Sequence, residues 1–171
     1  MITECYYESD QIRFCGKGEI CDAVFVHFPS ITFEGITLKN CTFKDCQQVF
    51  FHGCTVDGCR LENVSLVYGQ FSKLTYCTFD TCCASGTLLT LEAEGEIEYC
   101  TFRHITILGE DGHIIHAVYG EKDKVRPLQN CHFKDCRVEC GKTILCEYLV
   151  SSETYKTQVV DHVDRTSCSF E

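Results

Sequence analysis

The segment Cys41-Thr42-Phe43-Lys44-Asp45-Cys46 is the first clear copy of a unit that recurs along this chain of 171 residues. Later copies begin at Cys59, Cys77, Cys100 and Cys131, so that successive copies start 18, 18, 23 and 31 residues apart. Five matched copies indicate a repeat protein, in which each unit is stabilised by contacts with its neighbours.

Alignment of the five copies separates the side chains that face inward from those that face outward. The first position is cysteine in every copy, and the residue two positions later is Phe43, Leu61, Phe79, Phe102 or Phe133. The residue between them is polar: Thr42, Arg60, Thr78, Thr101 or His132. Alternation with a period of two is typical of a strand with one buried face.

A third inward column consists of Cys46, Val64, Cys82, Ile105 and Cys136. It lies three residues beyond the aromatic column, and this odd step predicts a corner at which a second short strand begins. Strands of this kind bury their inner face when the copies stack as coils, because each strand then pairs in parallel with its equivalent one coil away. We therefore predict ladders of like residues, one of cysteine and one of phenylalanine, inside the stack.

The unequal repeat lengths predict loops between the core strands, because lengthening a loop costs little free energy. We expect the extra residues near 92–96 and 109–125. Strand-like segments at 87–91 and 113–118 accompany them and are expected to form another face of the coil.

Two groups of β-helix proteins resemble parts of this sequence. Between residues 31 and 79 the chain resembles pentapeptide-repeat proteins, whose coils carry a small inward residue and Leu or Phe two positions later. The matching pairs are Ile31/Phe33, Ile36/Leu38, Cys41/Phe43, Cys54/Val56, Cys59/Leu61, Val64/Leu66 and Gly69/Phe71. The rhythm slips after Cys46 and after Phe71, and the usual Ala-Asp/Asn-Leu signature is missing.

The uneven coils further along the chain more closely resemble the right-handed β-helix repeats of pectate-lyase-like folds. There, strands such as 97–102 and 128–133 alternate with loops of variable length. The two resemblances cover roughly residues 20–150 and imply a fold far more strongly than a function. We predict an all-β, right-handed parallel β-helix, a solenoid of about six coils with inward Cys and Phe ladders and variable loops.

The length of the chain fits a single β-helix domain spanning residues 1–171. We predict an N-terminal cap at residues 1–20 and a C-terminal cap, or a last incomplete coil, at residues 147–171. Cys168-Ser169-Phe170 restarts the repeat next to the final residue. Because open strand edges recruit other chains, three alternatives stay open: a longer chain, a fold-back of the last residues, and a homo-oligomer formed through an end coil.

The formal net charge is −10, and hydrophobic residues make up 44% of the chain. This composition disfavours disorder, a membrane span and direct nucleic-acid binding, which needs a basic face. The first residues lack the features of a secretory signal, so we expect a cytoplasmic protein, or one exported without a conventional signal peptide. Its 16 cysteines are then reduced and pack as small hydrophobes. Cys83, Cys140 and Cys146 fall outside the clearest inward columns, so a reactive thiol among them stays an alternative.

The outward positions do not predict a catalytic centre. Glycoside cleavage needs two carboxyl groups roughly 5–10 Å apart, and the nearest approach of two acids is Asp80 beside Glu62, both flanked by cations. His113 and His116 point to opposite faces if 113–118 is a strand, so they cannot then share a metal. The cysteine pairs lack the spacing of compact zinc sites. We therefore predict no catalytic, cofactor-binding or metal-binding residues, and no cofactor.

A regular scaffold without converging catalytic groups favours a non-enzymatic protein–protein interaction module, whose protein partner the sequence does not identify. The candidate partner-binding loop contains Glu110, Asp111, His113, His116, Glu121, Lys122, Asp123 and Lys124. Two alternatives stay open. The resemblance to pentapeptide-repeat proteins implies an acidic DNA mimic that inhibits a DNA-binding enzyme such as gyrase. The resemblance to pectate-lyase-like folds implies a small carbohydrate-active lyase or hydrolase.

Overall fold

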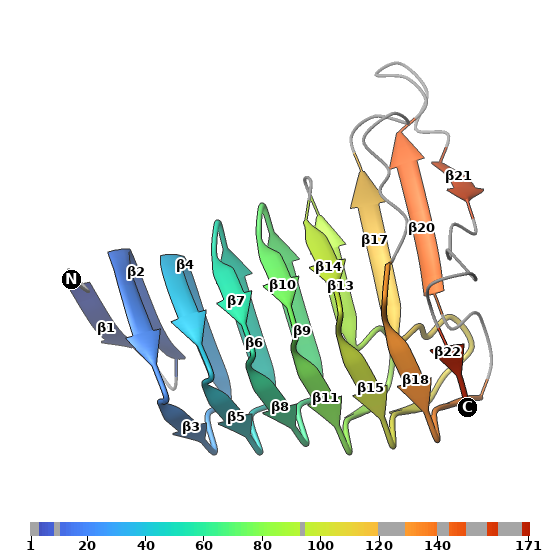
Figure 1. The fold of residues 1–171 in the computed structure, drawn as a ribbon, viewed down its shortest axis with the longest axis horizontal. Coiled ribbons are helices and arrows are strands. Elements are labelled where there is room, and N and C mark those ends of the chain that lie inside the picture. The colour runs from blue at the N-terminus through green and yellow to red at the C-terminus, as the bar shows by residue number, and fades with distance from the viewer. Residues whose placement is uncertain are drawn as a thin grey trace.

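In the computed structural model, the strands wind into a parallel β-helix in which each coil stacks on the one before it (Figure 1). The structure describes residues 4–8, 11–92, 95–119, 129–139, 144–149, 157–160 and 169–171. Within these residues every regular element is a strand, and all strand pairs are parallel except β1 with β2 and β20 with β21. The predicted all-β parallel fold is therefore confirmed.

The strands form three sheets, which we name A, B and C. Sheet A comprises β1 (Glu4–Glu8), β2 (Gln11–Cys21), β4 (Ser30–Lys39), β6 (Gln48–His52), β7 (Thr55–Asp57), β9 (Leu66–Gln70), β10 (Lys73–Thr75), β13 (Leu89–Glu92), β14 (Glu96–Glu98), β17 (Ile115–Tyr119), β20 (Ile144–Leu149) and β21 (Thr157–Val160). Sheet B comprises β3 (Val24–Val26), β5 (Thr42–Lys44), β8 (Arg60–Glu62), β11 (Thr78–Asp80), β15 (Thr101–Arg103), β18 (His132–Lys134) and β22 (Ser169–Phe170). Sheet C comprises β12 (Cys83–Ala84), β16 (Thr106–Ile107) and β19 (Arg137–Val138).

The strands of sheet B stack in register, so that equivalent residues of successive coils are paired. One column runs through the whole sheet and consists of Phe25, Phe43, Leu61, Phe79, Phe102, Phe133 and Phe170. The ring centroids of Phe79 and Phe102 lie 4.6 Å apart, and those of Phe102 and Phe133 lie 4.9 Å apart, with nearly parallel planes. The predicted phenylalanine ladder is confirmed. The column also continues in register to Phe25 in the first strand of sheet B and to Phe170 in the last.

The inward columns of the repeat form the core of the protein. Cys41, Cys59, Cys77, Cys100 and Cys131 are buried, as are Cys46, Val64, Cys82 and Ile105, whereas Cys136 in the last column is half-buried. Phe33 and Phe51 of sheet A pack edge-on against Phe43 of sheet B. The facing sheets therefore share one hydrophobic core.

Each corner beside sheet B is built on one residue with a left-handed backbone. At the corner after sheet B these residues are His27, Asp45, Asn63, Thr81, His104 and Asp135, and at the corner before it they are Asp22, Asn40, Gly58, Tyr76, Tyr99 and Asn130. This conformation costs a non-glycine residue about 1–2 kcal/mol. For all of these residues but Asn130, the structure gives a hydrogen bond from the backbone N–H to the next coil that offsets part of the cost, as from Asn63 to the carbonyl oxygen of Asp80 at 3.1 Å.

Where an inward cysteine follows a corner residue, its thiol is hydrogen-bonded as well as packed. The S–H of Cys59 is shared between the carbonyl oxygens of Asp57, at 3.5 Å, and of Leu38 one coil back, at 3.7 Å. Its sulfur also accepts the backbone N–H of Cys41 at 3.3 Å. Equivalent carbonyl oxygens accept the thiols of Cys41, Cys46, Cys54, Cys77, Cys82, Cys100 and Cys136.

Ser72 shows that a hydroxyl can make the same contacts as a thiol at the position after a corner residue. It follows the corner residue Phe71 as the cysteines follow theirs, and its hydroxyl donates to the carbonyl oxygens of Gln70 at 3.0 Å and Phe51 at 3.1 Å. It also accepts the N–H of Cys54 at 3.0 Å. Burying a hydroxyl is unfavourable unless it is hydrogen-bonded, and the same kind of carbonyl pair satisfies the hydroxyl of Ser72 and the cysteine thiols, whereas Val64 and Ile105 fill their corners by packing alone. The sequence-based interpretation of these cysteines as packing residues was therefore incomplete.

The structure differs from the prediction at three segments. Strand β13 begins at Leu89 and β17 at Ile115, each two residues later than expected. Because residues 115–119 belong to sheet A, they interrupt the loop that was expected over residues 109–125. At the N-terminus, β2 pairs in parallel with β4 and therefore belongs to the stack and not to a cap. The described strand that covers this end of sheet A is β1.

Two replacements of Cys59 test the corner hydrogen bonds. Cys59→Ala removes the donor that the carbonyl oxygens of Asp57 and Leu38 share, and we expect the free energy of unfolding to fall by about 2 kcal/mol. Cys59→Ser keeps a donor, as at Ser72, and should be the less destabilising change. Urea unfolding under reducing conditions measures both. If the thiol acted through packing alone, Cys59→Ser would be more destabilising than Cys59→Ala. That order would contradict a role for the hydrogen bond.

Candidate functional site

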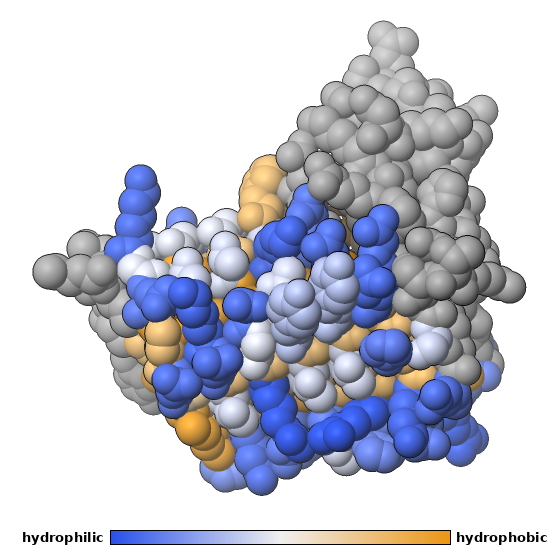
Figure 2. All heavy atoms as spheres, viewed as in Figure 1, coloured by the Kyte–Doolittle hydropathy of each residue, from blue (hydrophilic) through white to orange (hydrophobic). Residues whose placement is uncertain are grey.

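The outward face of sheet B carries charged side chains that contact one another from coil to coil. One outward column consists of Lys44, Glu62, Asp80, Arg103 and Lys134. Arg60 lies in the other outward column of the same face, because strand residues of equal parity share a face. Figure 2 shows hydrophilic side chains gathered over this row of strands. Neighbouring strands are about 4.8 Å apart, so each charged group can reach the coils on both sides.

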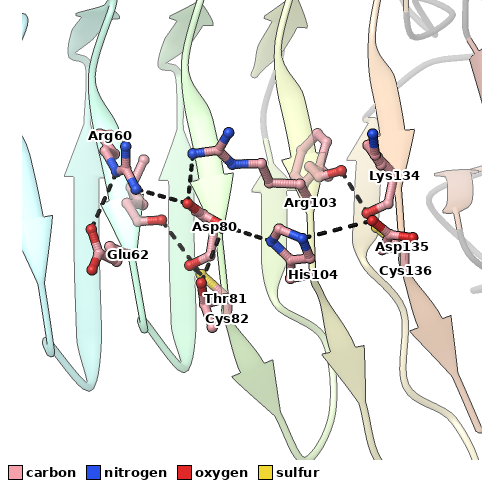
Figure 3. Close-up of polar contacts among 12 residues, drawn as sticks. Arg60, Glu62, Asp80, Thr81, Cys82, Arg103, His104, Lys134, Asp135 and Cys136 are labelled. Carbon is pink, nitrogen blue, oxygen red and sulfur yellow. Dashed lines mark hydrogen bonds and ion pairs between the residues drawn. The ribbon is translucent and has the colours of Figure 1, made fainter.

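Asp80, the last residue of β11, is the centre of this cluster (Figure 3). Its carboxylate is buried, yet Oδ2 accepts hydrogen bonds from Nη2 of Arg60 at 2.8 Å and from Nη2 of Arg103 at 2.7 Å. Oδ1 accepts the hydroxyl of Thr81 at 3.1 Å and lies 3.1 Å from Nδ1 of His104. The partners come from the coil before, the same coil and the coil after.

These contacts fix the charge of Asp80. Burial alone raises the pKa of the carboxyl, but the hydrogen bonds from Arg103, His104 and Thr81 outweigh burial and lower the pKa of Asp80 to about 2. The group is therefore an ionised carboxylate at neutral pH, and both of its oxygens are engaged. It cannot serve as a general acid near pH 7.

The network continues from Asp80 along the face. Glu62 forms ion pairs with Nε of Arg60 at 3.2 Å and with Nζ of Lys44 at 3.2 Å. On the other side, Nε2 of His104 lies 3.7 Å from Oδ2 of Asp135. The contacts run from Lys44 on β5 through β8, β11 and β15 to Asp135, the residue that follows β18. Figure 3 shows the part of this row from Arg60 to Asp135.

The sequence indicated only part of this arrangement. The cations that flank Asp80 and Glu62 are confirmed. The central role of Asp80 was missed, because Arg60 reaches it diagonally from the other outward column. An acid with an arginine one coil to either side is the signal that could have revealed it. Among the residues that the structure describes, no cluster of His, Cys, Asp or Glu could hold a metal ion.

The predicted partner-binding loop is only partly within the described residues. Glu110 and Asp111 are exposed, whereas His113 is buried and His116 lies in β17. The rings of the two histidines meet edge to face with centroids 6.0 Å apart. They were expected to point to opposite faces only if the strand included both, and β17 begins after His113, so strand alternation does not extend to it.

The remaining residues predicted for this loop, Glu121, Lys122, Asp123 and Lys124, lie outside the described part of the chain. The described part of the loop adjoins sheet A, whereas the Asp80 network lies on sheet B. The structure therefore presents two separate candidate surfaces. Within the described residues, no helix is long and apolar enough to cross a membrane.

The thiols of the core are poorly suited to nucleophilic chemistry. Every cysteine whose side chain the structure describes is free of disulfide bonds. Burial raises the pKa of Cys82 to about 11 and raises the pKa of Cys54 and of Cys59. A neutral thiol is a weak nucleophile, so these groups act as hydrogen-bond donors. Cys83 is exposed on β12, while Cys140 and the side chain of Cys146 lie outside the described residues.

Comparison with known protein families identifies a match. The sequence model of the family described as "Right handed beta helix region" matches residues 22–124. The matched segment contains β3 to β17 and the whole of the Arg60–Asp80–Arg103 contact. No curated protein matches the chain.

Replacement of Asp80 by asparagine tests the network. Asp80→Asn removes the charge between Arg60 and Arg103, so we expect a loss of about 2 kcal/mol in the free energy of unfolding at pH 7. Because the pKa of Asp80 is lowered from 3.8 to about 2 in the folded protein, its stabilising effect is present above about pH 4 and is lost as the pH falls toward 2. Urea unfolding at pH 7, 5, 4 and 3 should show the two proteins converging.

The matched control is Asp111→Asn, which makes the same chemical change at an exposed loop position. We expect this variant to change the free energy of unfolding by less than about 0.5 kcal/mol at every pH. If Asp80→Asn behaves like Asp111→Asn, the buried carboxylate does not hold the face together.

Proposed function

The chain belongs to the right-handed β-helix family, and we propose that it is a non-enzymatic protein–protein interaction module. The observation that carries this proposal is the network around Asp80, in which charged groups are held in place by one another across successive coils. A surface whose side chains are already ordered loses little conformational entropy when a partner binds. The stacked strands beneath it supply the rigidity.

The chemistry of the same face favours recognition over catalysis. Glycoside hydrolysis needs one carboxyl group that holds a proton and another that is ionised. Asp80 is ionised with both oxygens occupied, and Glu62 is paired with Arg60 and Lys44. In this part of the described structure, the acids are therefore committed to ion pairs.

The mixed charges of this face also suggest the kind of partner. A surface with Lys44, Glu62, Asp80, Arg103 and Lys134 in one column suits a protein with complementary charges of both signs, because such pairing sets specificity and orientation. A mimic of duplex DNA needs an unbroken acidic stripe, and the sign changes along sheet B do not favour that alternative. The exposed acids Glu110 and Asp111 offer a second contact region beside sheet A.

Affinity capture from lysate of the source organism under reducing conditions tests the proposal. Lys134→Glu reverses an exposed charge at one end of the sheet B column, and Lys17→Glu makes the same change on sheet A. Mass spectrometry should identify a protein that the wild type and Lys17→Glu capture and that Lys134→Glu captures at least about tenfold less, because one lost interfacial charge pair is worth more than about 1.4 kcal/mol.

Two results would contradict the proposal. One is capture that does not distinguish Lys134→Glu from Lys17→Glu. The other is the formation of ultraviolet-absorbing products from a panel of pectin, alginate and related uronic polymers, which would identify a lyase.

A further inference from the structure

The two large sheets end differently at the N-terminal end of the stack. Sheet A is covered there by β1, which pairs antiparallel with residues Gln11 to Cys15 of β2. Sheet B ends on β3, whose one neighbour among the described residues is β5. Figure 1 shows β3 as the first strand of the lower row, with β1 lying beside β2 above it. One edge of β3 is therefore uncovered by the described chain.

The backbone of β3 presents hydrogen-bonding groups at this edge. The N–H of Thr42 donates to the carbonyl oxygen of Ala23 at 2.8 Å, and the N–H of His27 donates to that of Lys44 at 3.0 Å. The backbone groups of a strand point alternately to its two sides. The N–H and C=O of Phe25 therefore face β5, and those of Val24 and Val26 face away from it. Two N–H and two C=O groups are thus directed outward, in the spacing that a further strand would pair with.

The side chains at this edge are apolar where later coils carry polar ones. Val24 is 65% exposed and Val26 is 38% exposed. Their counterparts on β5 are Thr42 and Lys44. Natural edge strands are commonly protected by charged residues such as lysine, and the first coil lacks this protection. Figure 2 shows hydrophobic side chains at this end of the row.

The shape of the end determines what can occupy it. Strand β1 adds one layer to sheet A beyond β2, and within the described part of the chain sheet B has no matching layer beyond β3. A second β-helix stacked end to end meets β1 before it reaches β3. A single extended segment fits the missing layer, since one strand has the thickness of β1. The half-buried residues Phe14, Ile20 and Phe28 at the same end of the core can contact its inward side chain.

We propose that the free edge of β3 is a docking site for an extended segment of a partner protein, which adds to sheet B as one more strand. The segment pairs its backbone with Val24 and Val26 and places an apolar side chain over Phe25, continuing the phenylalanine ladder. This is strand addition at a sheet edge, in which main-chain hydrogen bonds give affinity and alternate side chains give specificity. The proposal rests on the proposed function as an interaction module and identifies the form of the partner.

Amide hydrogen exchange measured by NMR tests the state of the edge. In the free protein, the amides of Val24 and Val26 should exchange at least about tenfold faster than those of Phe25 and His27, because only the latter two bond to β5. The probe is an acetylated and amidated synthetic peptide, Thr-Thr-Val-Phe-Val-Thr-Thr. Its addition should slow exchange at Val24 and Val26 by at least about tenfold. The same peptide with N-methyl groups on alternate amides cannot complete the ladder and should have no effect.

Slow exchange at Val24 and Val26 in the free protein would overturn the proposal, because the edge would then already be covered. Sedimentation would identify the cover as a second copy if the protein is a dimer, or as its own chain if it is a monomer. Equal effects of the methylated and unmethylated peptides, or no effect of either, would also overturn it.

A pair of substitutions locates the peptide site. Val24→Lys places a charge on the edge strand and should weaken peptide binding, measured by fluorescence polarisation, at least about tenfold. Thr42→Lys is the matched control in the same column one coil inward, and it should leave binding unchanged. Equal affinity for both variants would contradict docking at β3.

The same variants separate this proposal from the broader function. If capture of a partner is lost in Lys134→Glu but not in Val24→Lys, and the peptide does not bind, the proposed function is supported and the docking site at β3 is contradicted. If the peptide binds at β3 but no captured partner depends on the sheet B charges, the docking site is supported and the role of the charged face is contradicted.

Discussion

At most corners of the stack, the hydrogen bonds of a cysteine thiol couple the turn of the chain to the coil before it. A left-handed residue such as Gly58 turns the backbone, and the cysteine that follows it donates to one carbonyl of its own coil and one of the preceding coil. The turn and the stacking are therefore stabilised by the same side chain. Ser72 makes the same contacts with a hydroxyl, so the contacts need a small donor and not specifically a thiol.

The regular register that these corners impose creates the charged face. Arg60 and Arg103 lie in separate coils, and they meet at Asp80 because sheet B keeps equivalent residues aligned despite the longer loop before Arg103. In the same regular stack, one edge of β3 has no neighbouring strand among the described residues. The rigid face and the free edge are thus consequences of one architecture, and both are suited to contact with another protein.

The repeat was sufficient to predict the core but not the contacts between coils. The alternation around Phe43 and Phe79 predicted which side chains are buried, because burial follows strand periodicity directly. The shared thiol bonds of Cys59 and the diagonal reach of Arg60 to Asp80 depend on distances between coils, which a one-dimensional pattern does not contain. The contact between His113 and His116 was missed because the start of a strand is set by pairing with a neighbour rather than by local sequence.

Raman spectroscopy of the S–H stretching vibration measures the corner thiols most directly, because this band is separate from the other vibrations of a protein. The account predicts a strong band, shifted to lower frequency than that of a free thiol in water, that moves to the free-thiol frequency on unfolding in urea. A band already at the free-thiol frequency in the folded protein would contradict the account. So would the loss of the band through disulfide formation in the purified, folded protein.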